Sequence, residues 1–224
     1  MMNATAFLRR DPRMDPARVG IVGHSEGGTI AFMCAAQCDS IAFVVSVAGM
    51  TIPGRECIVW QNGESLRRAG IPQQTVERYC DVIDSVFKRT AEAGRELSAE
   101  EAAQAVEEAA MRANLVKSAM GATAWFRFFV GYDPSADISR VRCDVLAMNG
   151  TRDCQVDAEA NLGVLERCKE LAGHLTVRRY EGLNHLFQHC VTGLPDEYYT
   201  IEETFSEEAL ADMADWIAAR EAVK

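Results

Sequence analysis

The stretch VGIVGHSEGG, residues 19–28, carries the strongest structural signal in this chain of 224 residues. Residues 19–23 form a short, apolar, β-branched run, which predicts a buried parallel strand. An alanine-rich helical pattern follows over residues 27–37. Between the two, residues 23–27 match the pattern G-x-S-x-G, so Ser25 is predicted to lie on a sharp turn from strand to helix.

Ser25 is the candidate nucleophile because a serine on such a turn projects its hydroxyl from the edge of the sheet. Flanking glycines are expected there, since side chains would collide with the neighbouring strand and helix. The helix N-terminus behind Ser25 favours a developing negative charge, and the backbone N–H of Glu26 is the expected oxyanion donor. The alternative, in which Ser25 is only a helix N-cap, stays open.

A serine hydroxyl needs a base, and we predict that His185 is that base. His185 follows a strand predicted over residues 175–180, at the sheet edge where Ser25 also emerges. Of the other histidines, His24 lies inside the turn and His174 precedes the predicted strand. His189 lies four residues beyond His185. Two alternatives remain, a loop histidine without a role and a metal pair made by His185 with His189.

The acid of such a site should follow the strand predicted over residues 143–148, because the chain order in this arrangement is serine, acid, histidine. The loop NGTRDCQVD, residues 149–157, offers two carboxylates, Asp153 and Asp157. Asp153 lies just past the strand and is the predicted acid, with the role of orienting the imidazole. Asp157 is predicted to cap the following helix and remains the alternative acid.

Short apolar runs alternate with helical patterns along most of the chain, which predicts an α/β fold with a mostly parallel sheet covered on both faces. Four strands are expected, at residues 19–23, 41–48, 143–148 and 175–180. Further helices are expected over residues 158–171 and 207–220, and a helix end near residues 4–10.

The alternation breaks between residues 55 and 130, where four helices are expected in succession, at residues 56–69, 73–93, 99–120 and 122–129. Ser98 and Glu101 form a capping box at the start of the third. We therefore divide the chain into a first core segment, a helical cap insertion and a second core segment, at residues 1–54, 55–135 and 136–224.

Composition narrows the function classes. The net charge of −10 and the isoelectric point near 4.9 argue against nucleic-acid and membrane-surface binding. The eight cysteines form no CxxC pair, so no zinc or redox motif is indicated, and reduced thiols are expected. The first residues lack the apolar stretch of a signal peptide, which favours a cytoplasmic location.

The motifs GHSEGG, NGTRDCQV and GLNHLFQ, followed by YYTIEETFSEEALADMADWI, together resemble bacterial serine esterases of the dienelactone-hydrolase-like α/β-hydrolase superfamily. The resemblance runs from about residue 5 to the C-terminus. It implies a carboxylesterase that cleaves small acyl esters through an acyl-enzyme, with Ser25, Asp153 and His185 as a catalytic triad. It implies a helical cap that shapes the acyl pocket, and no cofactor or metal. A thioesterase, acyltransferase or peptidase on the same scaffold, and a non-catalytic homologue, remain as alternatives.

The sequence departs from that pattern at its start. Such esterases have several strands before the nucleophile strand, and a loop in that segment supplies the second oxyanion donor; here only 18 residues precede Val19. The nucleophile strand is then expected to form an edge of the sheet. We expect either that a second copy of the chain covers this edge or that the chain is an N-terminally truncated product, in which case an export signal could lie in the missing segment.

Overall fold

The computed structural model describes residues 2–93 and 123–220. It divides into two compact units, Met1–Ile52 together with Pro134–Lys224, and Pro53–Asp133. The helix expected over residues 99–120 and its capping box lie outside the described residues. Among the described residues, no helix is both long and apolar enough to cross a membrane.

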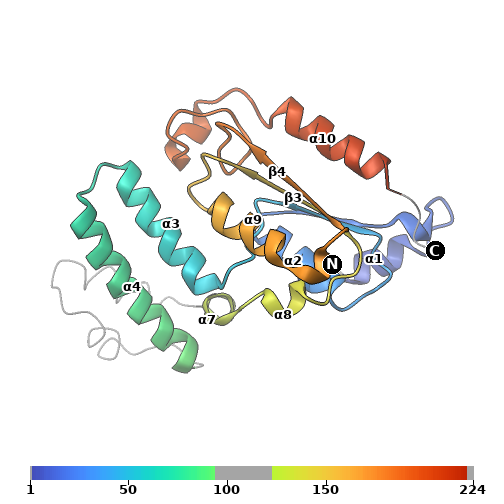
Figure 1. Ribbon diagram of the computed structural model, residues 1–224, viewed down its shortest axis with the longest axis horizontal. Helices are drawn as coiled ribbons and strands as arrows, with labels where there is room; N and C mark the ends of the chain where they lie inside the picture. The colour runs from blue at the N-terminus through green and yellow to red at the C-terminus, as the bar shows by residue number, and fades with distance from the viewer. Residues whose placement is uncertain (1, 94–122, 221–224) are drawn as a thin grey trace. The chain divides into compact units, whose positions relative to one another are not determined.

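The first unit is built on a parallel sheet of four strands in the order β1-β2-β3-β4 (Figure 1). All four strands predicted from the sequence are present, as β1 (Ile21–His24), β2 (Phe43–Val47), β3 (Asp144–Gly150) and β4 (Leu175–Tyr180). The register pairs the ends of neighbouring strands, with His24 opposite Val47 and Val47 opposite Met148. The carboxyl ends of the strands therefore share one edge of the sheet, where parallel-sheet sites form.

Helices cover both faces of this sheet (Figure 1). One face packs on α2 (Glu26–Ala35) and α9 (Ala158–Arg167), through apolar side chains that include Ile21, Phe32, Val44, Val145, Leu162 and Leu165. The other face packs on α10 (Glu207–Ala218), through side chains that include Phe43, Val45, Leu146, Met148, Ala209 and Trp216. The central strands β2 and β3 thus alternate their side chains between two cores, as the pleat of a β-strand requires.

The edge strand β1 is buried on one face only, which corrects the sequence-based expectation of a fully buried strand. Ile21 belongs to the core beside α2, whereas Val22 is 50% exposed and His24 is also exposed. The reason is that the core beneath α10 contains residues of β2 and β3 and none of β1. Within the described residues β1 is an edge strand, as expected from the sequence.

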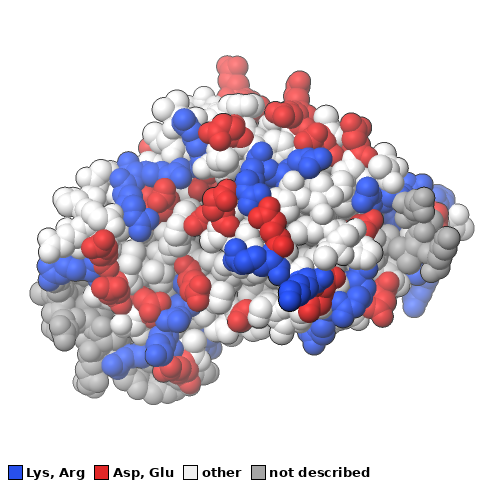
Figure 2. Space-filling view, in the orientation of Figure 1, with Lys and Arg blue, Asp and Glu red and all other residues white. Residues whose placement is uncertain are grey.

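Shorter elements complete this unit: α1 (Met2–Leu8), η1 (Pro16–Arg18), α8 (Ser135–Ile138), η2 (Lys169–Leu171) and η3 (Pro195–Tyr199). Acidic and basic side chains are interspersed over the face drawn in Figure 2. On this unit, Arg179 pairs with Glu159 at 2.8 Å and with Glu166 at 2.9 Å. Such exposed pairs contribute little to stability, typically about 0–1 kcal/mol each.

The second unit consists of helices, namely α3 (Gly54–Arg68), α4 (Gln73–Ala93) and α7 (Ala124–Gly131). Its own core includes Ile83, Val86, Phe87 and Val130. Phe87 and Phe126 pack edge to face with ring centroids 5.4 Å apart, so the aromatic side chains of this segment form part of the core of the unit. The role of this unit as a cap stays a prediction.

Candidate active site

Ser25 occupies a strained turn between β1 and α2. Its φ of 56° and ψ of −124° lie outside the regions that L-residues ordinarily adopt, and such conformations cost about 1–3 kcal/mol each. The backbone N–H of Ser25 donates to the carbonyl oxygen of Val47 at 2.8 Å, which fixes the turn to β2. Glu26 follows as the first residue of α2. The strand–turn–helix setting predicted for Ser25 is therefore present.

Two glycines allow the tight packing of this turn. A Cβ atom on Gly23 would lie 2.0 Å from the carbonyl oxygen of Gly27. A Cβ atom on Gly28 would lie 2.7 Å from Ser46 Oγ and 2.8 Å from Gly49 Cα. Gly27 differs, because a Cβ atom there would meet nothing within 4 Å. The expectation that both glycines flanking the serine avoid a collision is therefore wrong for Gly27, which points into open space.

We expect Gly28→Ala to lower the free energy of unfolding by about 1–3 kcal/mol, because the added methyl group would overpack against Ser46 Oγ and the backbone of Gly49. Gly27→Ala is the matched control. It should leave stability unchanged or raise it by up to about 1 kcal/mol, since alanine favours the helix and meets no neighbour. Urea unfolding of both variants measures the difference, and equal losses of stability would contradict this account of the turn.

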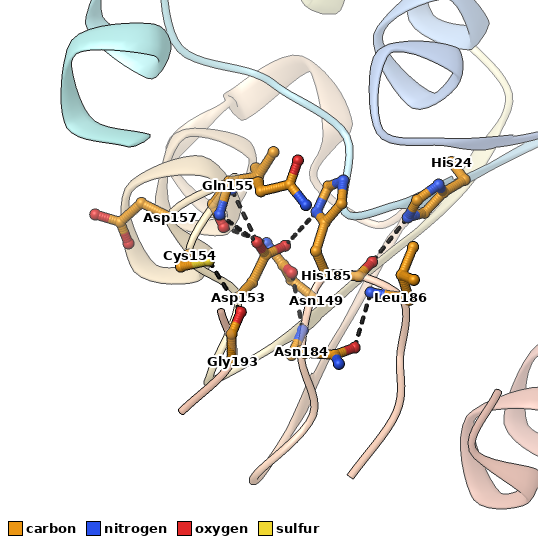
Figure 3. Close-up of polar contacts among 12 residues, drawn as sticks. His24, Asn149, Asp153, Cys154, Gln155, Asp157, Asn184, His185, Leu186 and Gly193 are labelled. Atoms are coloured by element: carbon orange, nitrogen blue, oxygen red, sulfur yellow. Dashed lines mark hydrogen bonds and ion pairs between the residues drawn. The ribbon is translucent and has the colours of Figure 1, made fainter. Parts of the chain in front are cut away.

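Asp153 and His185 form a buried pair at the carboxyl edge of the sheet (Figure 3). Oδ2 of Asp153 accepts a hydrogen bond from Nδ1 of His185 at 2.8 Å, and their side chains are 0% and 4% exposed. The other carboxylate oxygen, Oδ1, accepts from the backbone N–H groups of Gln155 and Val156 at 2.7 and 2.9 Å. Because Nδ1 of His185 carries the proton that it donates to the carboxylate, Nε2 is the ring nitrogen that is left to accept a proton.

Asn149, whose side chain is buried, holds the loop that carries Asp153 through two hydrogen bonds. Its Nδ2 donates to the carbonyl oxygen of Val156 at 3.1 Å, and its Oδ1 accepts from the N–H of Gly150 at 2.8 Å. The neighbouring Gln155 donates to the hydroxyl of Tyr198 at 2.9 Å. Desolvation raises the pKa of Tyr198 to about 12, so this hydroxyl stays protonated at neutral pH.

Asn184 shapes the loop that carries His185, and it is not among the site residues predicted from the sequence. Its fully buried side chain accepts hydrogen bonds from the N–H groups of Leu186 at 2.9 Å and Gln188 at 3.0 Å. Phe187 in the same loop has a φ of 60° and is completely buried, stacked on Phe205. The available signal in the sequence is the asparagine immediately before His185, because asparagine side chains readily hydrogen-bond to nearby backbone groups in loops.

The remaining sequence candidates have other partners. Asp157 caps α9, as predicted, by accepting from the N–H groups of Glu159 and Ala160. His174 lies at the amino end of the sheet, 3.1 Å from Asp144. His189 is exposed and pairs with Glu203 at 2.9 Å. Among the described residues, no group of three or more histidine, cysteine or carboxylate side chains gathers as a metal site would require.

Ser25 and His185 both belong to the carboxyl edge of the sheet, but no described residue forms a hydrogen bond with the Ser25 hydroxyl. In serine hydrolases without substrate this bond is often long, and it tightens in the substrate complex. His24, in contrast, contacts His185: its Nε2 lies 2.8 Å from the backbone oxygen of His185 (Figure 3). No motif in the sequence predicts this contact.

A parallel sheet with this strand order and a serine on a strained turn after β1 define the α/β-hydrolase class. The chain belongs to the family described as BAAT / Acyl-CoA thioester hydrolase C terminal, whose model matches residues 2–156. This match covers more than half of the chain and contains Ser25 and Asp153. It confirms the α/β-hydrolase membership expected from the sequence.

One solved structure supports the same fold. The structure of 2,6-dihydroxy-pseudo-oxynicotine hydrolase aligns with 99% of this chain at a TM-score of 0.50 and 15% identity. Acetyl xylan esterase 1 from Thermoanaerobacterium sp. JW/SL YS485 aligns with 97% of this chain at a TM-score of 0.49 and 16% identity. A Pyrococcus horikoshii acylaminoacyl peptidase aligns with 81% of this chain at a TM-score of 0.44 and 14% identity. The aligned regions make up 47%, 50% and 22% of those chains, so this chain spans about half the length of the first two. No curated protein gives a significant sequence match.

Proposed function

We propose that this chain is a serine hydrolase that cleaves small carboxylic esters through an acyl-enzyme on Ser25. The observation that carries the proposal is the buried hydrogen bond between Asp153 and His185. It lies at the sheet edge at which the strained turn holds Ser25. A buried, fully bonded carboxylate is what orients an imidazole as a general base. The family membership supports the same class of chemistry.

The proposed reaction begins when Oγ of Ser25 attacks the ester carbonyl carbon while Nε2 of His185 takes the hydroxyl proton. The carbonyl oxygen becomes an oxyanion, which the backbone N–H of Glu26 at the start of α2 stabilises. The tetrahedral intermediate collapses, and His185 returns the proton to the departing alcohol. Water then attacks the acyl group on Ser25 by the same proton transfers, which releases the acid and restores the serine.

Labelling with a fluorophosphonate probe tests this proposal directly, because Oγ of an activated serine displaces fluoride from the probe. We expect rapid, stoichiometric labelling of the purified chain and none of Ser25→Ala. A folded wild-type sample that stays unlabelled would contradict the proposal. Labelling that persists in Ser25→Ala would show that the nucleophile is a different residue.

Thioester hydrolysis is the second candidate, favoured by the family description, which names acyl-CoA thioester hydrolysis. The same residues would act, with a thiol in place of the alcohol as leaving group. A matched pair of substrates separates the two: the p-nitrophenyl ester and the coenzyme A thioester of one short acyl chain. A higher kcat/KM for the ester supports the esterase, whereas a preference for the thioester would select the second candidate.

A further inference from the structure

His24 joins two parts of the first unit that lie far apart in the sheet. It ends β1, at one edge, whereas His185 follows β4, at the other edge. Three strand spacings, roughly 14 Å, separate these edges. The loop after β4 and the side chain of His24 together span this distance, and they meet in the contact between the two histidines (Figure 3).

The contact has two parts. Nε2 of His24 lies 2.8 Å from the backbone carbonyl oxygen of His185, and because a carbonyl can only accept, the imidazole donates through Nε2–H. The two rings also pack, with centroids 4.7 Å apart and planes tilted by 48°. The carbonyl that His24 binds belongs to the residue that carries the proposed base, so the bond acts on the backbone of His185 and leaves its ring nitrogens for other partners.

The charge of His24 suits this position. Desolvation lowers the pKa of His24, and the nearby imidazole of His185 lowers it as well, against the raising effects of the hydrogen bond to the carbonyl and of the Asp153 carboxylate. His24 is therefore neutral at neutral pH. A neutral imidazole donates the same hydrogen bond as a charged one, but it does not oppose the positive charge that develops on His185 when it takes a proton.

We propose that His24 is a positioning residue that tethers the backbone of His185 to β1, the strand that leads into the turn at Ser25. This inference rests on the proposed function. His185 is then held at two points: Asp153 orients its ring through Nδ1, and His24 fixes its backbone relative to the serine turn. A reacting pair needs this second restraint, because a displacement of about 1 Å can cost on the order of 100-fold in rate.

The test compares His24→Phe, which fills the space but cannot donate, with His24→Gln, whose side-chain amide can donate in place of Nε2–H. We expect His24→Phe to lower kcat for ester hydrolysis about 10-fold or more, with KM changed less than about 3-fold, since a lost hydrogen bond leaves the carbonyl unpaired. His24→Gln should recover kcat to within about 3-fold of wild type. His174→Gln, at the amino end of the sheet, is the control and should match wild type.

A second readout does not depend on activity. The Nδ1 proton of His185, which is hydrogen-bonded to Asp153, is expected to give a low-field proton resonance in NMR spectra, and its exchange with water should report how firmly the ring is held. We expect this resonance to broaden or vanish in His24→Phe and to persist in His24→Gln and His174→Gln. An unchanged resonance in folded His24→Phe would overturn the inference.

The two proposals fail in different ways. If wild type labels with fluorophosphonate and His24→Phe labels equally fast with equal kcat, the positioning role is wrong and the serine hydrolase stands. If wild type does not label, the proposed function is wrong, and the resonance of His185 still decides whether His24 holds it. Loss of kcat in both His24→Phe and His24→Gln, with the resonance retained, would likewise overturn the tether.

Discussion

Asp153→Asn is expected to lower kcat for ester hydrolysis by about 10⁴-fold while the chain stays folded. The asparagine would keep one oxygen for the N–H groups of Gln155 and Val156, so the loop should retain its shape. Its NH₂ group would face Nδ1 of His185, which must then accept, so the ring proton moves to Nε2. The imidazole would be held in the wrong tautomer and could not take the proton from Ser25.

Asp157→Asn provides the matched control, since the same change is made four residues later in the same loop. Asparagine caps a helix as well as aspartate, so α9 should keep its N-terminus and kcat should stay within about 3-fold of wild type. Steady-state kinetics and urea unfolding of both variants make the comparison. Greater loss of activity in Asp157→Asn than in Asp153→Asn would show that the acid is Asp157.

Much of the fold could be predicted from the sequence, because strand and helix periodicity are local properties. The strand predicted over residues 175–180 has those bounds, and the helix predicted over residues 73–93 is α4. The error at β1 arose because burial depends on neighbours. Residues 19–23 are apolar in the manner of a central strand, but the core beneath α10 does not extend to β1, so Val22 is left half exposed.

The candidate site could be predicted where chain order and strand ends determine it. The sequence predicts Asp153 and His185 just past the ends of two strands, and in the structure these strands are neighbours and the two side chains meet. The contact of His24 with His185 depends on where the loop after β4 lies relative to β1, and no local sequence pattern predicts that position. The prediction for Gly27 is wrong for a similar reason, because the motif specifies glycine without showing which neighbour, if any, an added side chain would meet.

His185→Gln should have the largest effect, a loss on the order of 10⁶-fold in kcat, because no other group would take the proton from Ser25 during attack. The glutamine is polar and of similar length, so the buried site should not collapse. His189→Gln is the matched control, four residues further along the chain. His189 is exposed and bonded to Glu203, so its loss should change kcat by less than about 3-fold. Comparable losses in both variants would contradict the assignment of the base.

The double variant Asp153→Asn/His185→Gln tests whether the two residues work as one unit. Asp153 is proposed to act only by orienting the imidazole and stabilising its positive charge, so without the imidazole it has nothing to act on. The double variant should therefore be no more than about 3-fold slower than His185→Gln alone, since residues that act as a unit are strongly non-additive. A further loss approaching 10⁴-fold would mean that Asp153 contributes to catalysis independently of His185.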